Sequence, residues 1–226
     1  MTIQQFCDVL RTSGIQGVDA YEGKLLSLEA DQARLQDFAC EGRVAYLFQS
    51  YGWALTLRDG PDLEARAGGF YLGIEVKHCR WKKDHDPVVE AALASSEGEF
   101  VAIPRLIDTE RREEEWEQMY RFAKKNCHQY AAGEFNILFF VNHTVAHDDI
   151  TLQAAAHRYE EELQNPVCPE PMKNLNGMMT IFGYRRSGND SRSIYCEIIR
   201  GARKPLPDPL MLALYEIRDE PRILLG

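Results

Sequence analysis

Residues 60–78 of this 226-residue chain read GPDLEARAGGFYLGIEVKH, and this stretch decides which fold the sequence predicts. The run over residues 70–78 has the apolar, alternating pattern of a β-strand, in which successive side chains point to opposite faces. Four apolar side chains of the run would face a core, and Glu75 and Lys77 would share the other face. Charge on that face is costly unless it lines a cleft, so the pattern indicates a functional site.

A hairpin would bring a second carboxylate to the same place. The pair Gly68–Gly69 is typical of a tight turn, which would fold Asp62 back beside Glu75 and Lys77. Carboxylate and carbonyl oxygens are the ligands that Mg²⁺ prefers, so Asp62, Glu75 and the carbonyl of Val76 are the candidate metal ligands. A bound Mg²⁺ or Mn²⁺ would neutralise charge on a phosphate and activate an attacking water. Lys77 would hold the phosphate or the nucleophile, or act as a base.

The arrangement resembles the PD-(D/E)xK nuclease superfamily in Pro61, Asp62, Glu75 and Lys77, and the resemblance covers roughly residues 29–142. It implies an α/β, restriction-endonuclease-like fold, with a mixed central sheet flanked by helices. It also implies a metal-dependent nuclease that hydrolyses phosphodiester bonds, with DNA as the expected substrate. Asp62, Glu75 and Lys77 would then be the catalytic residues.

Members of the superfamily often add an acidic residue from the helix before the first core strand. Residues 40–53 have the pattern of such a helix and the entry to that strand, so Glu41 is the candidate for the additional catalytic acid. Gly42 weakens the expected helix start, and Glu29 is the alternative. Some members also place a glutamine on the helix after the lysine-bearing strand. Gln118 is the candidate for that role, although a polar residue on a helix surface is the plainer interpretation.

The length suits one α/β domain with a good core. We therefore expect a single nuclease-like domain, with a core at about 29–142, a helical addition at 1–28 and a β-rich extension at 143–226. The extension should hold two strands, which form either a hairpin at the sheet edge or a small cap. Periodicity and turn residues predict the main core elements as follows: helices over 24–38 and from Glu41 to Gly52, a strand over 53–57, the motif hairpin, a helix over 108–132 and a strand over 136–141. The order helix, strand, strand pair, helix, strand is the one that the suspected fold requires.

The net charge of −9 counts against a duplex-binding protein, which usually has a positive balance. Basic residues can nevertheless gather on one face. Arg80, Lys82 and Lys83 follow the motif directly and are the candidate nucleic-acid contacts, with Trp81 placed among them to stack on a base. Solvated charges at a loop edge are the alternative interpretation. Two further basic clusters occur at residues 185–192 and 200–204.

Cysteine usage and hydropathy bear on the compartment. Six cysteines are scattered without a Cys-x-x-Cys pair, which suits reduced thiols in a cytoplasmic protein. The apolar runs are short and the first residues lack the pattern of a signal peptide, so we expect no membrane partner. His143 and His147, followed by Asp148, have the spacing of a zinc site on a helix but follow a strand directly.

Alternatives remain for both site and function. In the alternative interpretation of the site, Asp62 only begins a turn after Pro61, and Lys77 pairs with Glu75 on a solvated edge strand. A catalytically inactive, nuclease-like scaffold or binding module in a larger assembly is the rival function. The acidic balance favours the rival, whereas the intact Asp, Glu and Lys set favours the enzyme. RNA or a small phosphate ester is a further possible substrate. A homodimer would suit an enzyme that cuts both strands.

Overall fold

The computed structural model describes residues 1–79, 115–142, 149–186 and 189–218. The predicted nucleic-acid contacts Arg80, Lys82 and Lys83 lie outside these residues, as do Trp81, His143 and His147. The helices are α1 (Ile3–Thr12), α2 (Val18–Ser27), α3 (Gln32–Ser50), α5 (Glu115–Lys125), α6 (Asp149–Leu163) and α7 (Asp208–Tyr215), with short 3-10 helices η1 (Cys127–Gln129) and η2 (Glu170–Asn174). The strands are β1 (Ala54–Leu57), β2 (Leu63–Ala67), β3 (Phe70–Cys79), β4 (Phe135–Asn142), β5 (Leu175–Arg186) and β6 (Asn189–Ile198).

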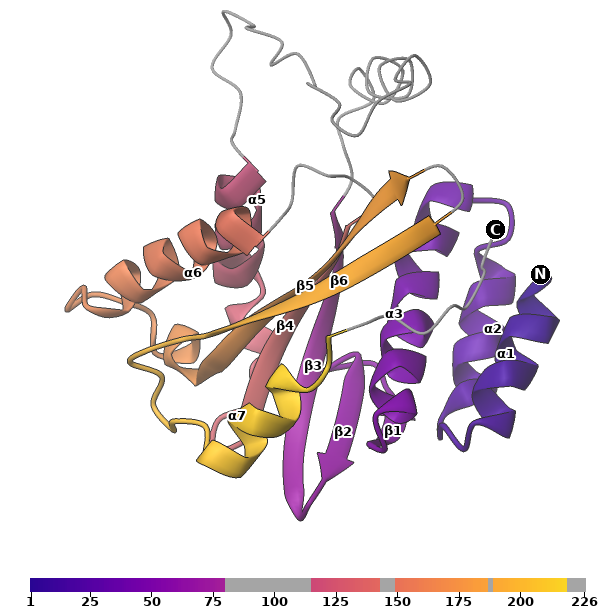
Figure 1. Ribbon diagram of the computed structural model, residues 1–226, viewed down its shortest axis with the longest axis horizontal. Helices are drawn as coiled ribbons and strands as arrows, with labels where there is room; N and C mark the ends of the chain where they lie inside the picture. The colour runs from indigo at the N-terminus through magenta and orange to yellow at the C-terminus, as the bar shows by residue number, and fades with distance from the viewer. Residues whose placement is uncertain (80–114, 143–148, 187–188, 219–226) are drawn as a thin grey trace, which may run out of the picture.

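The fold is α/β, with one six-stranded mixed open sheet in the order β1-β2-β3-β4-β5-β6 (Figure 1). The first three strands form an antiparallel meander. Strands β3, β4 and β5 then run parallel, and β6 returns antiparallel to β5. The parallel neighbours are joined by chain that includes α5 and α6, as parallel strands require. The two strands predicted after residue 143 therefore form a hairpin at the edge of this sheet.

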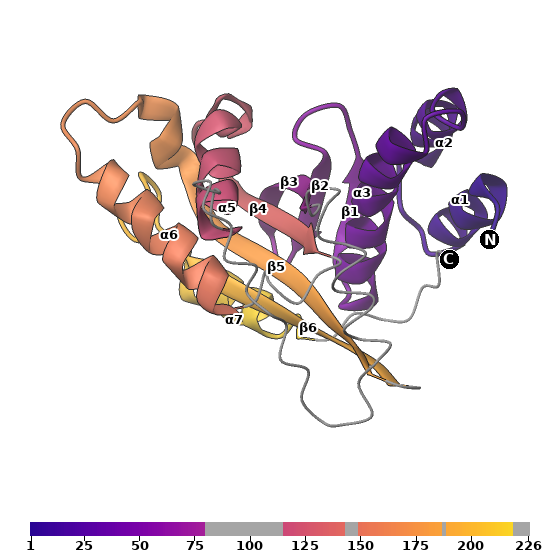
Figure 2. The same cartoon turned by 90° about the horizontal axis from the view of Figure 1, so that it is seen from above.

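Helices cover both faces of the sheet (Figure 2). Apolar residues of α1, α2, α3 and α7 belong to the core on one side of the sheet, and those of α5 and α6 belong to the core on the other side. Helix α3 lies next to the sheet, and α1 and α2 lie outside α3. Burial on both faces explains why β4 has no alternation, since all eight of its residues are buried.

The N-terminal helices differ from the predicted boundaries. The sequence predicted one helix over 24–38, but α2 ends at Ser27 and α3 begins at Gln32. The Asp31 carboxylate accepts a hydrogen bond from the N–H of Arg34 (3.1 Å) and caps α3 at its start. Gly42, expected at a helix start, lies inside α3. An added Cβ there would come within 2.8 Å of the Tyr21 hydroxyl, so glycine lets α2 pack closely on α3.

Other elements agree better with their predictions. The motif hairpin and the strand near 136–141 form within a few residues of their expected bounds, and the two strands expected in the extension are β5 and β6. Of the helix predicted over 108–132, the described part is α5 and η1. In the part of the chain that the structure describes, no helix is long and apolar enough to cross a membrane.

Candidate functional site

Strands β2 and β3 separate at Asp62, and we call this point the fork. The ladder between them ends at the pair Leu63–Ile74, whereas the ladder between β3 and β4 continues to Cys79. Asp62 sits immediately before β2, and its Oδ2 accepts a hydrogen bond from the N–H of Val76 (2.8 Å). A partly buried N–H needs an acceptor, and the aspartate supplies it where β2 no longer does. This bond fixes the Asp62 carboxylate beside the Glu-x-Lys segment.

Glu75 is buried, with 1% of its surface exposed, and it forms an ion pair through Oε1 with Lys77 Nζ. Strand β3 lies between β2 and β4, so the alternative of a solvated edge strand is wrong, although the Glu75–Lys77 pair does form. The other oxygen, Oε2, is buried without a hydrogen-bond partner in the described part of the chain. An unsatisfied buried oxygen costs about 1–3 kcal/mol and is therefore uncommon.

Glu41 approaches the fork from α3, one of the helices on the opposite face of the sheet from α5 and α6. Burial, and after it the charge of Asp62, raise the pKa of its carboxyl to about 8. Lys24 and Lys77 act in the opposite direction, and Glu75 adds a smaller raising effect. The predicted residues Glu41, Asp62, Glu75 and Lys77 are thus close enough to interact through their charges.

The other two carboxyls respond to the same environment. Burial raises the pKa of Asp62, while the Val76 N–H and the neighbouring lysines partly offset it. Burial and the charge of Asp62 raise the pKa of Glu75, against contacts from Lys77 and the Asp62 backbone. The carboxyls of Glu41, Asp62 and Glu75 are therefore hard to ionise together.

Few side chains at the fork could serve as metal ligands. Among the described residues, no group of three or more His, Cys, Asp or Glu side chains is arranged so that it could hold a metal ion. Two carboxylates are nevertheless what Mg²⁺ commonly takes from a protein, since the ion keeps several waters and uses substrate phosphate oxygens. Glu75 Oε2, which has no hydrogen-bond partner among the described residues, and the Asp62 carboxylate, held by the Val76 N–H, fit a hard divalent cation.

The sequence analysis did not identify Lys24 as part of this region. It lies on α2 and forms an ion pair with Asp59, in the loop that leads to Asp62. Its charge lowers the pKa values of both Glu41 and Asp62, against the effect of burial. The helix predicted over 24–38 placed Lys24 on the wrong element, and no local pattern relates a residue of α2 to the β1–β2 loop.

His78 and Asp37 form a second contact that the sequence did not reveal. His78 Nδ1 lies 2.8 Å from Asp37 Oδ1, and the histidine side chain is buried. Asp37 precedes Glu41 by one helical turn, so both lie on the same side of α3. The contact therefore ties α3 to β3 next to Lys77 and supports the position of Glu41.

The remaining candidates have different placements. Glu29 is exposed in the turn between α2 and α3, so the structure favours Glu41 over this alternative. Gln118 is half-buried on α5, and its role stays a prediction. In the basic cluster at 200–204, Arg203 pairs with Glu170, and the Lys204 ammonium lies 4.0 Å from the centre of the Phe135 ring. That cluster makes contacts within the protein.

Comparison with known proteins identifies no relative of this chain. No protein-family model, no curated protein and no solved structure matches the chain.

Proposed function

We propose that this protein is a divalent-metal-dependent nuclease with a restriction-endonuclease-like core, and that it hydrolyses phosphodiester bonds in DNA. The observation that carries the proposal is the convergence of Asp62, Glu75 and Lys77 at the fork, where Glu75 is 1% exposed and its Oε2 has no hydrogen-bond partner among the described residues. A chain that used these residues only for stability would gain little from burying such an oxygen.

The order of the elements supports the fold assignment. Among the described elements, α3, β1 to β3, α5 and β4 come in the order helix, strand, strand pair, helix and strand. Adjacent positions in the sheet follow the same order. The motif residues lie where β3 separates from β2 and continues beside β4, so they are held by a central strand.

The site chemistry supports a metal-dependent reaction. Asp62 and Glu75 would hold Mg²⁺ or Mn²⁺, and the carbonyl of Val76 would be a third ligand. When bound, the cation supplies charge neutralisation at a phosphate and a more acidic water. Lys77, with 24% of its side chain exposed, can reach a phosphate from the same face of β3. Glu41 would contribute a further carboxylate from α3.

The rival function is an inactive scaffold with the same core. The net charge of −9 favours the scaffold, because an acidic protein can bind nucleic acid only where its basic residues gather on one part of the surface. In that case Lys77 would serve only to neutralise Glu75. The two functions differ in whether the fork binds a divalent cation and whether that binding supports cleavage.

Calorimetric titration with Mn²⁺ tests the proposal. We expect saturable binding by the wild type and its loss in Asp62→Asn and in Glu75→Gln. Glu216→Gln is a matched control, because Glu216 is an exposed carboxylate at the end of α7 and its loss should leave binding intact. Circular dichroism would verify that all variants are folded.

Cleavage is then measured on single-stranded and duplex DNA with Mg²⁺ or Mn²⁺. Lys77→Ala should retain the fold and lose cleavage by at least about a hundredfold, which is a common cost of removing a charged group that stabilises a transition state. Mn²⁺ binding without cleavage of any tested DNA would favour the scaffold. Absence of Mn²⁺ binding, both alone and with DNA present, would contradict the nuclease proposal.

A further inference from the structure

Lys24 links the two elements that bring carboxylates to the fork. Its ammonium forms an ion pair with Asp59 in the β1–β2 loop, three residues before Asp62. The same ammonium lies 5.9 Å from the centre of the Phe38 ring, which is three residues before Glu41 on α3. A single lysine of α2 thus lies beside the segments that carry Asp62 and Glu41.

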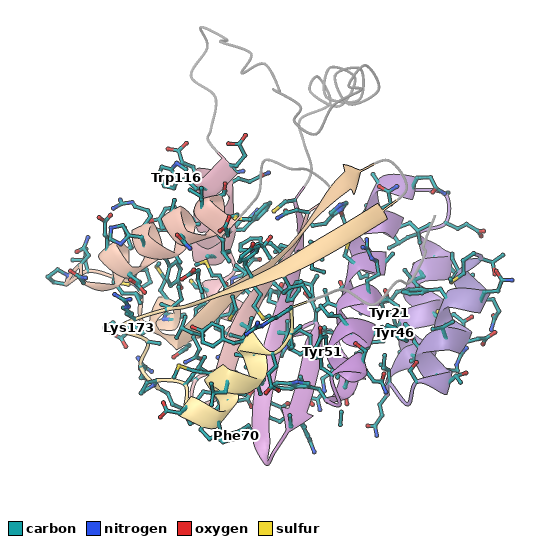
Figure 3. All side chains as sticks on the ribbon, in the orientation of Figure 1. Tyr21, Tyr46, Tyr51, Phe70, Trp116 and Lys173 are labelled. Atoms are coloured by element: carbon teal, nitrogen blue, oxygen red, sulfur yellow. The ribbon has the colours of Figure 1, made fainter. Side chains whose placement is uncertain are left out.

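The position of Lys24 is fixed by tight helix packing. Tyr21, one turn earlier on α2, donates a hydrogen bond to the Phe38 carbonyl (2.6 Å) and accepts one from the Gly42 N–H (3.0 Å). Tyr21 is 4% exposed and lies where α2 meets α3 (Figure 3). Because α2 is held against the part of α3 that carries Glu41, the Lys24 stem starts from a defined place next to the fork.

The charge of Lys24 remains available to solvent. Its side chain is 38% exposed, and that of its partner Asp59 is 86% exposed. An exposed ion pair contributes at most about 1 kcal/mol, so another anion can replace Asp59 at small cost. The charge of Lys24 also acts on the carboxyls of Glu41 and Asp62, which agrees with its placement beside the fork.

We infer that Lys24 is a substrate-binding residue of this site, which takes a backbone phosphate of the nucleic acid next to the phosphate held at the fork. In the unliganded protein Asp59 holds the ammonium, and a substrate phosphate displaces that carboxylate. A compact ammonium on a flexible stem suits a phosphate that is bound for position and not for sequence. The inference rests on the proposed function and adds a role for the N-terminal helices.

Binding of a fluorescein-labelled DNA oligonucleotide, followed by fluorescence anisotropy with Ca²⁺ in place of Mg²⁺, tests the inference. Because Lys24→Gln would lose one phosphate contact, it should bind the DNA about fivefold to tenfold more weakly than the wild type at low salt. The slope of the logarithm of the binding constant against the logarithm of the salt concentration should be smaller by about one. Lys24→Arg should retain most of the affinity. Lys173→Gln is the control, because Lys173 is similarly exposed, pairs with Glu170 and lies far from α2 in Figure 3.

Asp59→Asn separates direct binding from a structural role. If Lys24 contacts the phosphate, removing its competing carboxylate should leave DNA affinity unchanged or raise it. If Lys24 acts only by holding the loop of Asp62, Asp59→Asn and Lys24→Gln should weaken binding alike, and that result would overturn the inference.

The outcomes also distinguish this inference from the proposed function. If Lys24→Gln binds DNA with the affinity and salt dependence of the wild type, and the wild type cleaves DNA, the role of Lys24 is rejected and the nuclease proposal still holds. A wild-type protein that binds neither single-stranded nor duplex DNA would remove the basis of both. Weaker binding by Lys24→Gln with unaltered Mn²⁺ binding is the supporting result.

Discussion

Neutralising Glu41 should change how the stability of the protein depends on pH. Burial and the charge of Asp62 raise the pKa of Glu41 to about 8, from an ordinary value near 4.5. Between these values the folded protein retains a proton that the unfolded chain releases. Ionisation therefore costs nothing below about pH 4.5, and its full cost is present above about pH 8. Stability falls as pH rises through this window.

The structure sets the size of this effect. A shift from 4.5 to about 8 corresponds to about 5 kcal/mol at most. Glu41 is only partly buried, so solvent should reduce the cost to about 2–3 kcal/mol. Glu41→Gln removes the ionisation. We therefore expect the variant to match the wild type at about pH 4 and to exceed it by about 2–3 kcal/mol at about pH 9.

Urea unfolding with a chelator present, followed by tryptophan fluorescence at several pH values, measures this difference. Glu29→Gln is the matched control, since this carboxylate is exposed in the turn before α3 and its removal should leave the profile unchanged. Parallel stability profiles for Glu41→Gln and the wild type would refute the argument, because they would mean that Glu41 ionises equally well in both states.

Three further predictions concern packing and metal affinity. Gly73→Ala should destabilise by about 1–3 kcal/mol in urea unfolding, because the added Cβ would lie 3.1 Å from the rigid Pro61 ring and 3.2 Å from Asn136 Oδ1, which is held by the Ala131 N–H. Gly23→Ala, whose Cβ would meet no atom within 4 Å, should not destabilise. Asn136→Ala should lower the free energy of unfolding by about 2–4 kcal/mol, because the buried Asn136 side chain forms hydrogen bonds with three carbonyls and one N–H. Asn165→Ala, which removes an exposed side-chain amide, should lower it by less than about 1 kcal/mol. Equal losses of stability in the two variants would contradict this prediction. Mn²⁺ affinity measured by calorimetry should rise between about pH 6 and pH 9, because the fork carboxyls have raised pKa values and must lose protons to bind metal; a flat profile would contradict it.

Local sequence patterns predicted much of the fold. Alternation over residues 70–78, the Gly68–Gly69 turn and the continuous apolar run near 136–141 predicted the motif hairpin and the strand that pairs with it. These features are local because a strand's faces follow from a period of two and a turn from its own glycines. The α/β class and the placement of Asp62 beside Glu75 and Lys77 could therefore be derived from the sequence alone.

Long-range packing decided the rest. Gly42 signals a weak helix in isolation, yet α3 continues through it because α2 packs closely at that position. The proximity of Lys24 to Asp59, and of His78 to Asp37, joins segments that no periodicity relates. Burial of Glu75 depends on neighbours on both sides of β3. The pKa of Glu41 is raised by burial and by the charge of Asp62, against the charges of Lys24 and Lys77. The sequence by itself determined which groups could perform chemistry. Only the tertiary structure determined their burial and mutual charges, because desolvation and Coulomb interactions depend on distances that residue order does not encode.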